Sequence, residues 1–271
     1  MPNLSDFKPE TTFRALFVGR SGDGKSGAAA SFPKPYHELD FDLRIAGIAG
    51  CTNWLSENDK ISYQQFMPRS GWAPVDKHLT NLEFNAIAYR GNPALYQFPY
   101  KTIGLGSLTS LTRLLVSYSM QYTKGKTIGP EKAEDAIKLR IIGPSDINAE
   151  SNGTLTVLDY IRSWPCNFIA TAHIVDKWGK LESHEKEDNY KPQEVIGEKL
   201  SIRDNLGESV IALFDNVFRF SRREQGGKVI YEVEFAGDLA KNAFGILPGK
   251  YDITEKEFYP FFQNLIQKVK K

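Results

Sequence analysis

The sequence predicts an α/β domain in which helices flank a mostly parallel β-sheet, with an antiparallel hairpin late in the chain. Short apolar runs alternate with stretches of helical periodicity, which is typical of parallel strands connected by helices. A glycine-rich segment at residues 19–26 lies directly between an apolar run and a helical stretch. Near the end, apolar runs at residues 217–222 and 229–235 flank a Gln-Gly-Gly turn, which favours a hairpin.

Length and composition fit one globular domain spanning residues 1–271, which is long enough to bury a full core. Lys and Arg total 34 against 33 Asp and Glu, so the overall charge gives no argument for nucleic acid or an anionic membrane. We find no secretory signal and no apolar run approaching the roughly 20 residues that cross a bilayer. Cys51 and Cys166 lack metal-ligand spacing and indicate a reducing compartment. We therefore expect a cytoplasmic protein without a membrane partner.

The first predicted strand, residues 13–18, runs into a segment that fits G-x-x-x-x-G-K-[ST], and a short helical stretch follows until Pro33. This order of strand, glycine loop and helix is the context that a phosphate-binding loop requires. Its glycines let backbone N–H groups turn inward around phosphate oxygens. Lys25 would contact the β- and γ-phosphates, and the Ser26 hydroxyl would bind Mg²⁺. The candidate nucleotide-binding residues are Gly19, Arg20, Ser21, Gly22, Asp23, Gly24, Lys25, Ser26 and Gly27.

The remaining elements follow in order along the chain. Candidate strands occupy residues 36–42, 99–106 and 166–173. Helices are predicted over residues 107–118, 146–164, 209–214 and 254–271, the last with a clear apolar face. Two polar segments, at about 121–145 and 174–204, are predicted to be long loops. His37, His78 and His184 show no partners in the sequence pattern and are assigned no role.

The order of these motifs resembles the RecA-like P-loop ATPases, and within them the compact phage-encoded ATPases of single-strand annealing recombination, which carry a phage nucleotide-binding AAA-type domain. The resemblance covers residues 13 to about 235, and only the phosphate loop is specific by itself. The matching segments are the loop at 19–26, the A-A-A-S-F-P-K-P after it, L-D-F-D at 39–42, I-G-L-G-S-L-T-S-L at 103–111, F-I-A-T-A-H at 168–173 and F-D-N-V-F-R-F at 214–220.

The resemblance implies roles for particular residues. Asp40 and Asp42 would lie near the γ-phosphate of ATP and position the attacking water, with Asp42 the better candidate. His173 would sense the γ-phosphate. The two long loops would contact single-stranded DNA, the protein would assemble as a homo-oligomer, and a phage-encoded protein would act in the host cytoplasm.

The sequence departs from the family at Gly106, where an aspartate that holds Mg²⁺ is expected at the end of a strand. Three interpretations stay open. In the first, Asp40 or Asp42 takes over the role of holding the metal. In the second, the strand that carries the aspartate is instead residues 155–159, ending at Asp159, although the spacing of these residues continues a helix. In the third, the site binds nucleotide and hydrolyses it slowly, because phosphoryl transfer depends on positioning and electrostatics.

Basic residues give a weaker argument for DNA binding. Lys124 and Lys126 lie in the first long loop, with tyrosines nearby that could stack on bases. Arg219, Arg222 and Arg223 form a tighter cluster, which could face DNA, reach a neighbouring subunit's γ-phosphate as arginine fingers, or face solvent.

The leading hypothesis is therefore a phage-type recombination or single-strand annealing ATPase that binds ATP and Mg²⁺. The first alternative is a catalytically weak protein in which bound ATP stabilises an assembly or a partner interface. A second alternative is a small-molecule kinase with the second long loop as its lid.

Overall fold

The computed structural model describes residues 12–51, 53, 55–67, 70–122, 127–128, 139–140, 142–180 and 193–269. Its main sheet has nine strands: β1 (Arg14–Gly19), β2 (Tyr36–Asp40), β3 (Ile61–Gln65), β4 (Thr102–Gly106), β7 (Asn167–Lys180), β8 (Gln193–Leu200), β9 (Asn216–Gln225), β10 (Lys228–Glu234) and β11 (Lys250–Asp252). The helices are α1 (Lys25–Ala30), α2 (Ala46–Ala49), α3 (Ala73–Gly91), α4 (Leu108–Tyr122), α5 (Pro144–Ser163), α6 (Asp204–Ala212) and α7 (Phe258–Val269), with a 3₁₀ turn η2 (Asn58–Lys60).

The sheet is mostly parallel. Its strand order is β11-β10-β9-β1-β7-β4-β2-β3, and β8 pairs with β7 beyond this path. The strands from β9 to β3 pair in parallel, whereas β10 and β11 continue the sheet antiparallel. The predicted α/β class, parallel sheet and late hairpin are therefore confirmed. The carboxyl ends of the parallel strands meet at one edge, which is where open α/β sheets bind ligands.

Two hydrophobic clusters cover the two faces of the sheet. Alternation along β1 sends Leu16 and Val18 to one cluster and Ala15 and Phe17 to the other, because successive strand side chains point to opposite faces. The first cluster packs under α3, α4, α5 and α6. The second lies with α1, α2 and α7 and is rich in phenylalanine, including Phe218 on β9. Both faces of β1 are thus buried, so the loop that follows it starts from a rigid strand.

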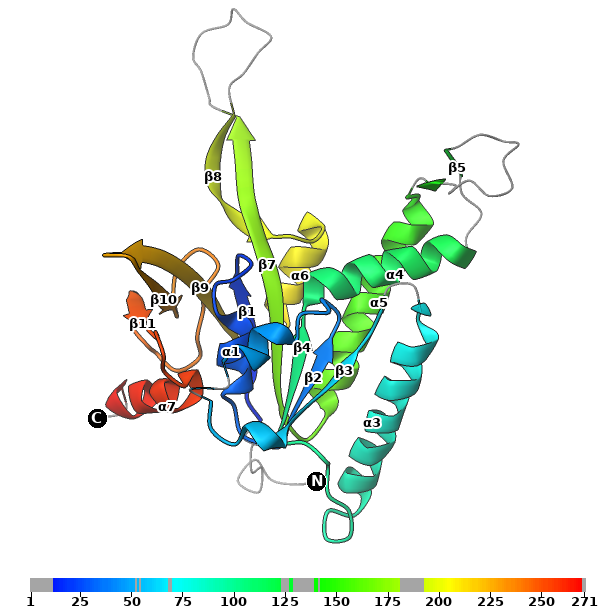
Figure 1. The fold of residues 1–271 in the computed structure, drawn as a ribbon. Helices are drawn as coiled ribbons and strands as arrows, with labels where there is room; N and C mark the ends of the chain where they lie inside the picture. Colours follow the sequence, from blue (N-terminus) through cyan, green and yellow to red (C-terminus); the bar gives the residue numbers. More distant parts are fainter. Residues whose placement is uncertain are drawn as a thin grey trace, which may run out of the picture.

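The predicted loop at 174–204 is wrong over much of its length. Strand β7 continues to Lys180 and pairs antiparallel with β8, and α6 begins at Asp204. Figure 1 shows the β7–β8 hairpin projecting beyond the carboxyl ends of the neighbouring strands β1 and β4. Charged residues dominate it because neither face of the projecting part packs on a core, so the strands carry no apolar period. The predicted loop at 121–145 is also shortened, since α4 extends to Tyr122, β5 (Thr127–Ile128) pairs with β6 (Leu139–Arg140), and α5 starts at Pro144.

Residues 43–98, to which sequence patterns assigned no element, contain β3 and α3. The apolar residues of α3 do not segregate onto one face: Val75 is buried, while Phe84 and Ile87 are exposed. Strand β3 lies at the edge of the sheet and is only partly buried, so its apolar alternation is weak. Helix α5 contains residues 155–159, which removes the interpretation of that segment as a metal-binding strand; Asp159 is exposed there and pairs with Arg162. Helix α7 begins at Phe258, four residues later than predicted.

In the part of the chain that the structure describes, no helix combines the length and apolarity needed to cross a membrane.

Candidate phosphate-binding site

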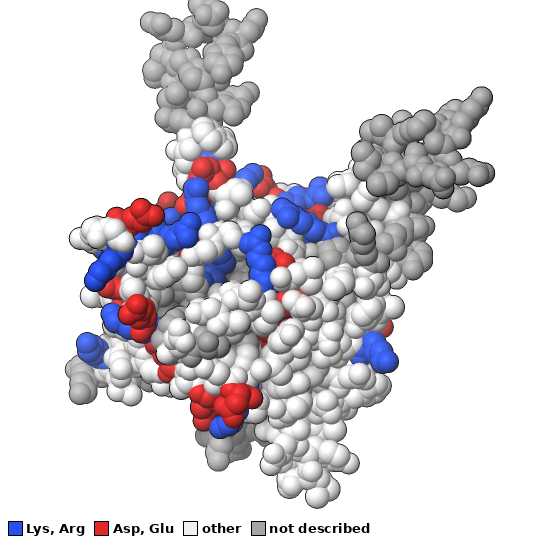
Figure 2. All heavy atoms as spheres, viewed as in Figure 1, with Lys and Arg blue, Asp and Glu red and all other residues white. Residues whose placement is uncertain are grey.

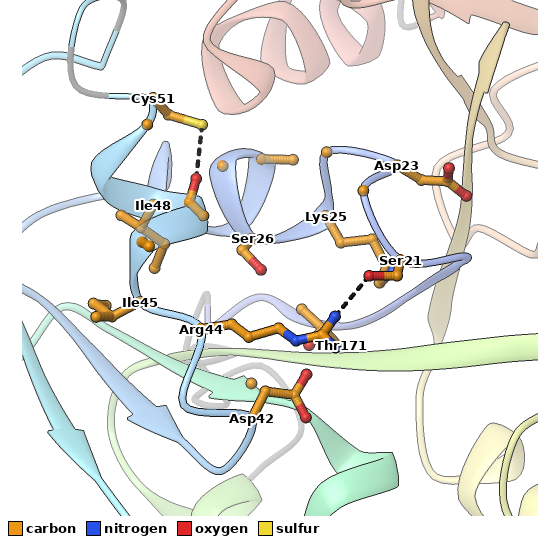
Figure 3. A pocket seen from close by; sticks show the side chains of 18 of the residues that line it. Ser21, Asp23, Lys25, Ser26, Asp42, Arg44, Ile45, Ile48, Cys51 and Thr171 are labelled. Carbon is orange, nitrogen blue, oxygen red and sulfur yellow. Dashed lines mark hydrogen bonds between the residues drawn. The ribbon is translucent and has the colours of Figure 1, made fainter.

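A cavity of about 590 Å³ lies at the carboxyl edge of the parallel strands. The loop at residues 21–28 forms one wall, and the ends of β2, β4 and β7 form the other (Figure 3). Its volume falls in the range of small-molecule sites. The strand-side residues that line it include Glu38, Asp40, Asp42, Arg44, Gly106, Thr171 and His173.

The loop has the backbone form that its glycines predict. Gly22 and Gly24 have φ of 85° and 86°, a conformation that residues with a side chain rarely adopt. The Arg20 N–H donates to the Asp23 carboxylate at 2.6 Å, which closes the turn. The Ala28 N–H donates to the Gly24 carbonyl at 3.0 Å and begins α1. The loop therefore lies between β1 and a helix, as the motif requires.

The hairpin β9–β10 packs against this loop, and Tyr231 of β10 also lines the cavity. An added Cβ would lie 3.1 Å from the Arg222 guanidinium at Gly22, and 3.2 Å from the Tyr231 ring at Gly24. Gly19 is held even more closely, since its Cβ would overlap the Phe220 carbonyl oxygen. The three glycines are thus needed for close packing as well as for backbone conformation.

Lys25 lies inside the loop and is only 6% exposed. Its Nζ donates to the carbonyl oxygens of Gly19 at 2.8 Å and Arg20 at 2.7 Å. No carboxylate of the described residues forms an ion pair with it. Burial lowers the pKa of Lys25 to about 8, against the opposing effect of Asp23 and Asp42. An anion entering the cavity would stabilise the charged ammonium, and phosphate oxygens are suited to this.

The side chains of Asp42, which follows β2, and of His173, which lies in β7, meet in this cavity. Asp42 Oδ1 accepts from the Ser107 hydroxyl at 2.9 Å and from the Ser110 hydroxyl, and Oδ2 lies 3.3 Å from His173 Nε2. Burial alone would raise the pKa of Asp42, but hydrogen bonds from His173, Ser110 and Ser107 together lower it to about 2. Asp42 is therefore an anion fixed in position, and a weak proton acceptor.

Asp40 has a different environment. Its carboxylate accepts from the N–H groups of Arg44 and Ile45, both at 3.1 Å, and from Gln65 Nε2 at 2.9 Å. It thereby fixes the turn after β2, which carries Asp42 and Arg44. Strand β2, which ends at Asp40, is not the neighbour of β1 in the sheet, because β7 and β4 lie between the two strands. Asp42 still lines the cavity, since the chain crosses the end of β4 there and the Asp42 N–H donates to the Gly106 carbonyl at 3.0 Å.

Two residues of the cavity were not predicted from sequence. Arg44 Nη1 donates to the Ser21 hydroxyl at 2.6 Å, so this arginine bridges the turn after β2 and the phosphate loop. Figure 3 shows it stretched across the cavity between Asp42 and the loop. Glu38 is only 4% exposed, accepts a hydrogen bond from the Tyr36 hydroxyl, and has its pKa raised to about 8 by burial. The only sequence signal for Glu38 was its spacing of two from Asp40, which places both on one face of β2.

Two of the three arginines in the cluster on β9 form ion pairs. Arg219 contacts Glu198 at 2.6 Å and Glu234 at 3.3 Å, and Arg223 contacts Glu232 at 2.8 Å. On the face seen in Figure 2, Lys and Arg lie interleaved with Asp and Glu rather than gathered in a patch of one sign. The charges of Arg219 and Arg223 are thus matched by glutamates, whereas Arg222 forms no ion pair with the described residues and lies against Gly22 of the loop. The predicted DNA contact of Arg223 gains no support from free charge here. Lys124 and Lys126 lie outside the described residues.

His37 and His78, which showed no partners in the sequence, contact each other on the opposite face of β2. Their Nε2 atoms are 3.0 Å apart, and His37 Nδ1 lies 2.8 Å from the Ser62 hydroxyl. The His37 ring stacks on Tyr100 at 4.5 Å. Sequence reasoning missed the pair because α3 brings His78 over β2 from 41 residues away. His184 lies outside the described residues.

No protein-family model matches this sequence, and no curated protein is significantly similar to it.

Proposed function

We propose that this protein binds ATP with Mg²⁺ in the cavity between the loop at 19–27 and the ends of β2, β4 and β7. The observation that carries the proposal is the environment of Lys25, a buried ammonium group that only main-chain carbonyls hold in place. Such a group is poorly stabilised by its surroundings, as its lowered pKa indicates. The triphosphate of a nucleotide supplies the missing negative charge at the position where this motif places it.

The oxygen atoms that line the cavity fit Mg²⁺. The Ser26 hydroxyl and the carboxyl groups of Glu38 and Asp42 line the same space, and Mg²⁺ prefers oxygen ligands. Among the described residues no three acidic, His or Cys side chains form a metal cluster on their own. This agrees with an ion that is held by one or two protein groups together with phosphates and water. When bound, Mg²⁺ would neutralise charge on the phosphates, and Ser26 would hold it.

The arrangement of the other residues supports a RecA-like ATPase. Lys25 would hold the β- and γ-phosphates. Because the pKa of Asp42 is about 2, Asp42 would orient an attacking water by its fixed charge rather than take its proton. His173 contacts Asp42 directly, so it is placed to sense an occupied γ-phosphate position. Arg44 lies across the cavity within the same chain, where it would stabilise charge on the γ-phosphate.

We propose a role in phage-type DNA recombination or single-strand annealing, on the basis of the sequence resemblance. One observation favours the alternative of a catalytically weak nucleotide-binding protein: Gly106 brings no carboxylate to the end of β4, where the resemblance expects one. The two functions differ in turnover, whereas both require ATP binding.

The test is to measure phosphate release with and without single-stranded DNA, alongside the melting temperature with and without ATP and Mg²⁺. A recombination ATPase would show turnover that single-stranded DNA increases and that Lys25→Ala removes. A nucleotide-stabilised binding protein would show a higher melting temperature with ATP and no turnover in either condition. Absence of both effects would reject the proposed function.

A further inference from the structure

Strand β4 carries glycine at two positions that face the cavity side of the sheet, and the neighbouring strand explains both. β2 pairs with β4 in parallel, with Glu38 opposite Gly104 and Asp40 opposite Gly106. A Cβ at Gly104 would overlap the Tyr36 hydroxyl and Glu38 Oε2, and a Cβ at Gly106 would overlap Glu38 Oε1. The side chains of β2 thus lie over the bare face of β4. The carboxyl group of Glu38 takes the space that a side chain at position 106 would otherwise fill.

From this geometry we propose that Glu38 supplies, from the neighbouring strand, the carboxylate that holds the water shell of Mg²⁺ in place of a side chain at Gly106. The proposal rests on the proposed nucleotide site. A glutamate is one carbon longer than an aspartate, which suits a group that reaches across from the next strand. Glu38 would act as a positioning residue, because it would contact the waters of the ion rather than the nucleotide.

The other two acids of this wall are already engaged by the protein. Asp40 accepts hydrogen bonds from two main-chain N–H groups and from Gln65. Asp42 accepts from Ser107, Ser110 and His173. In contrast, Oε2 of Glu38 accepts one hydrogen bond, from the Tyr36 hydroxyl, and no donor of the described residues contacts its Oε1. Of the three acids, Glu38 therefore keeps an oxygen available for water bound to a cation.

The burial of Glu38 also favours a cation in this place. A carboxyl group that is removed from water without a basic partner costs free energy. No Lys or Arg of the described residues forms an ion pair with Glu38, and Asp40 and Asp42 add negative charge near it. A divalent ion beside Ser26 would stabilise all three acids.

The test uses Mn²⁺ as a spectroscopic substitute for Mg²⁺. Binding of Mn²⁺ in the presence of a non-hydrolysable ATP analogue is followed by electron paramagnetic resonance, and binding of the analogue in EDTA is followed by calorimetry. The variant Glu38→Gln keeps the shape and the hydrogen bond with Tyr36. We expect it to bind the analogue in EDTA as the wild type does, but to bind Mn²⁺ roughly 10- to 100-fold more weakly, as for the loss of an outer-shell ligand partner.

Glu150→Gln is the matched control, because Glu150 is also a buried glutamate but lies on α5, where it pairs with Arg203. It should leave Mn²⁺ affinity unchanged. Moving the carboxylate from β2 to β4 sharpens the test. Gly106→Asp alone should lower the melting temperature, because the new Cβ would overlap Glu38 Oε1. The double variant Glu38→Ala with Gly106→Asp should bring Mn²⁺ affinity back to within a few-fold of the wild type.

Unchanged Mn²⁺ affinity in Glu38→Gln, with a wild type that binds the analogue, would overturn this inference and leave the proposed function standing. A wild type that binds no ATP analogue at all would overturn both.

Discussion

The cavity beside the phosphate loop and the hairpin β9–β10 both concentrate charged residues, but they neutralise them differently. On the hairpin, Arg219 and Arg223 are matched by glutamates at distances of 2.6 to 3.3 Å. In the cavity, the hydrogen bonds within the described part of the chain join Lys25 to two carbonyl oxygens and Glu38 to a tyrosine hydroxyl.

The difference indicates where a ligand is needed. Paired surface charges contribute about 0–1 kcal/mol each and require nothing further. Buried charges without a partner lower stability until something compensates them. Among the described residues, the cavity brings the Lys25 ammonium group and the Glu38 carboxyl group to one space without an ion pair to either, which suits a ligand that carries its own anions and cation. A nucleotide with Mg²⁺ has this composition.

The largest expected effect is on turnover, from a change at the fixed anion of the cavity. Asp42→Asn keeps the shape but removes the charge that would orient water. Phosphate release should fall roughly 100- to 1,000-fold, as when a group that stabilises the transition state is removed. ATP affinity measured in EDTA should not fall, because without the cation Asp42 only repels the phosphates. Steady-state kinetics and calorimetry on the same preparation measure the two effects, and a variant that hydrolyses ATP at the wild-type rate would contradict the assignment.

A second prediction concerns His37, a buried histidine that does not line the cavity. Burial, with a smaller effect of His78, lowers its pKa from 6.5 to about 4. The unfolded chain therefore binds the proton more readily between pH 6.5 and pH 4. Neutral His37 therefore makes its full contribution to the free energy of unfolding above pH 6.5. As the pH falls to about 4, the free energy of unfolding decreases by about 3 kcal/mol at most.

Denaturant unfolding of the wild type and of His37→Asn across this pH range isolates the effect. The difference between their unfolding free energies should shrink as the pH falls. A difference between wild type and His37→Asn that does not depend on pH would contradict the buried neutral state of His37.

The stability contribution of Glu38 depends on pH in the opposite direction. Its pKa is raised to about 8, so its contribution is present below pH 4.5 and is lost as the pH rises to about 8. The difference in unfolding free energy between wild type and Glu38→Gln should therefore change with pH in the opposite direction to that of His37→Asn.

The smallest effect is expected on the paired hairpin. Arg223→Gln breaks a half-exposed ion pair with Glu232, so the free energy of unfolding should fall by less than about 1 kcal/mol. ATP affinity should stay within error of the wild type, because Arg223 does not line the cavity. Thermal melts and a nucleotide titration measure both quantities. Weaker ATP binding in this variant would show that the Arg223–Glu232 ion pair is coupled to the cavity.

The sequence allowed local features of the site to be predicted. The glycine-rich loop at residues 19–26 joins the end of β1 to the start of α1, as the pattern of strand, glycines and helix predicted. That it binds phosphate stays a prediction. The resemblance implied that Asp42 and His173 lie near the same phosphate, and the two side chains lie 3.3 Å apart. The fold class followed from the alternation of strands and helices.

Features that depend on register between distant segments could not be predicted. Glu38 matters because β2 pairs with β4 and places it over Gly106, and nothing in either segment alone shows this pairing. The pairing of Arg219 with Glu198 depends on the projecting β7–β8 hairpin, whose exposed strands lack an apolar period. Arg44 reaches Ser21 because Asp40 fixes the turn between them, a tertiary effect.

The most direct measurement is isothermal titration calorimetry of ATP with Mg²⁺ into the wild type and Lys25→Ala. We predict a saturable heat of binding at one site in the wild type. Affinity should fall roughly 100-fold or more in the variant, because charge-assisted contacts to two phosphates are lost. No heat of binding in the wild type, or equal affinity in both proteins, would contradict the account.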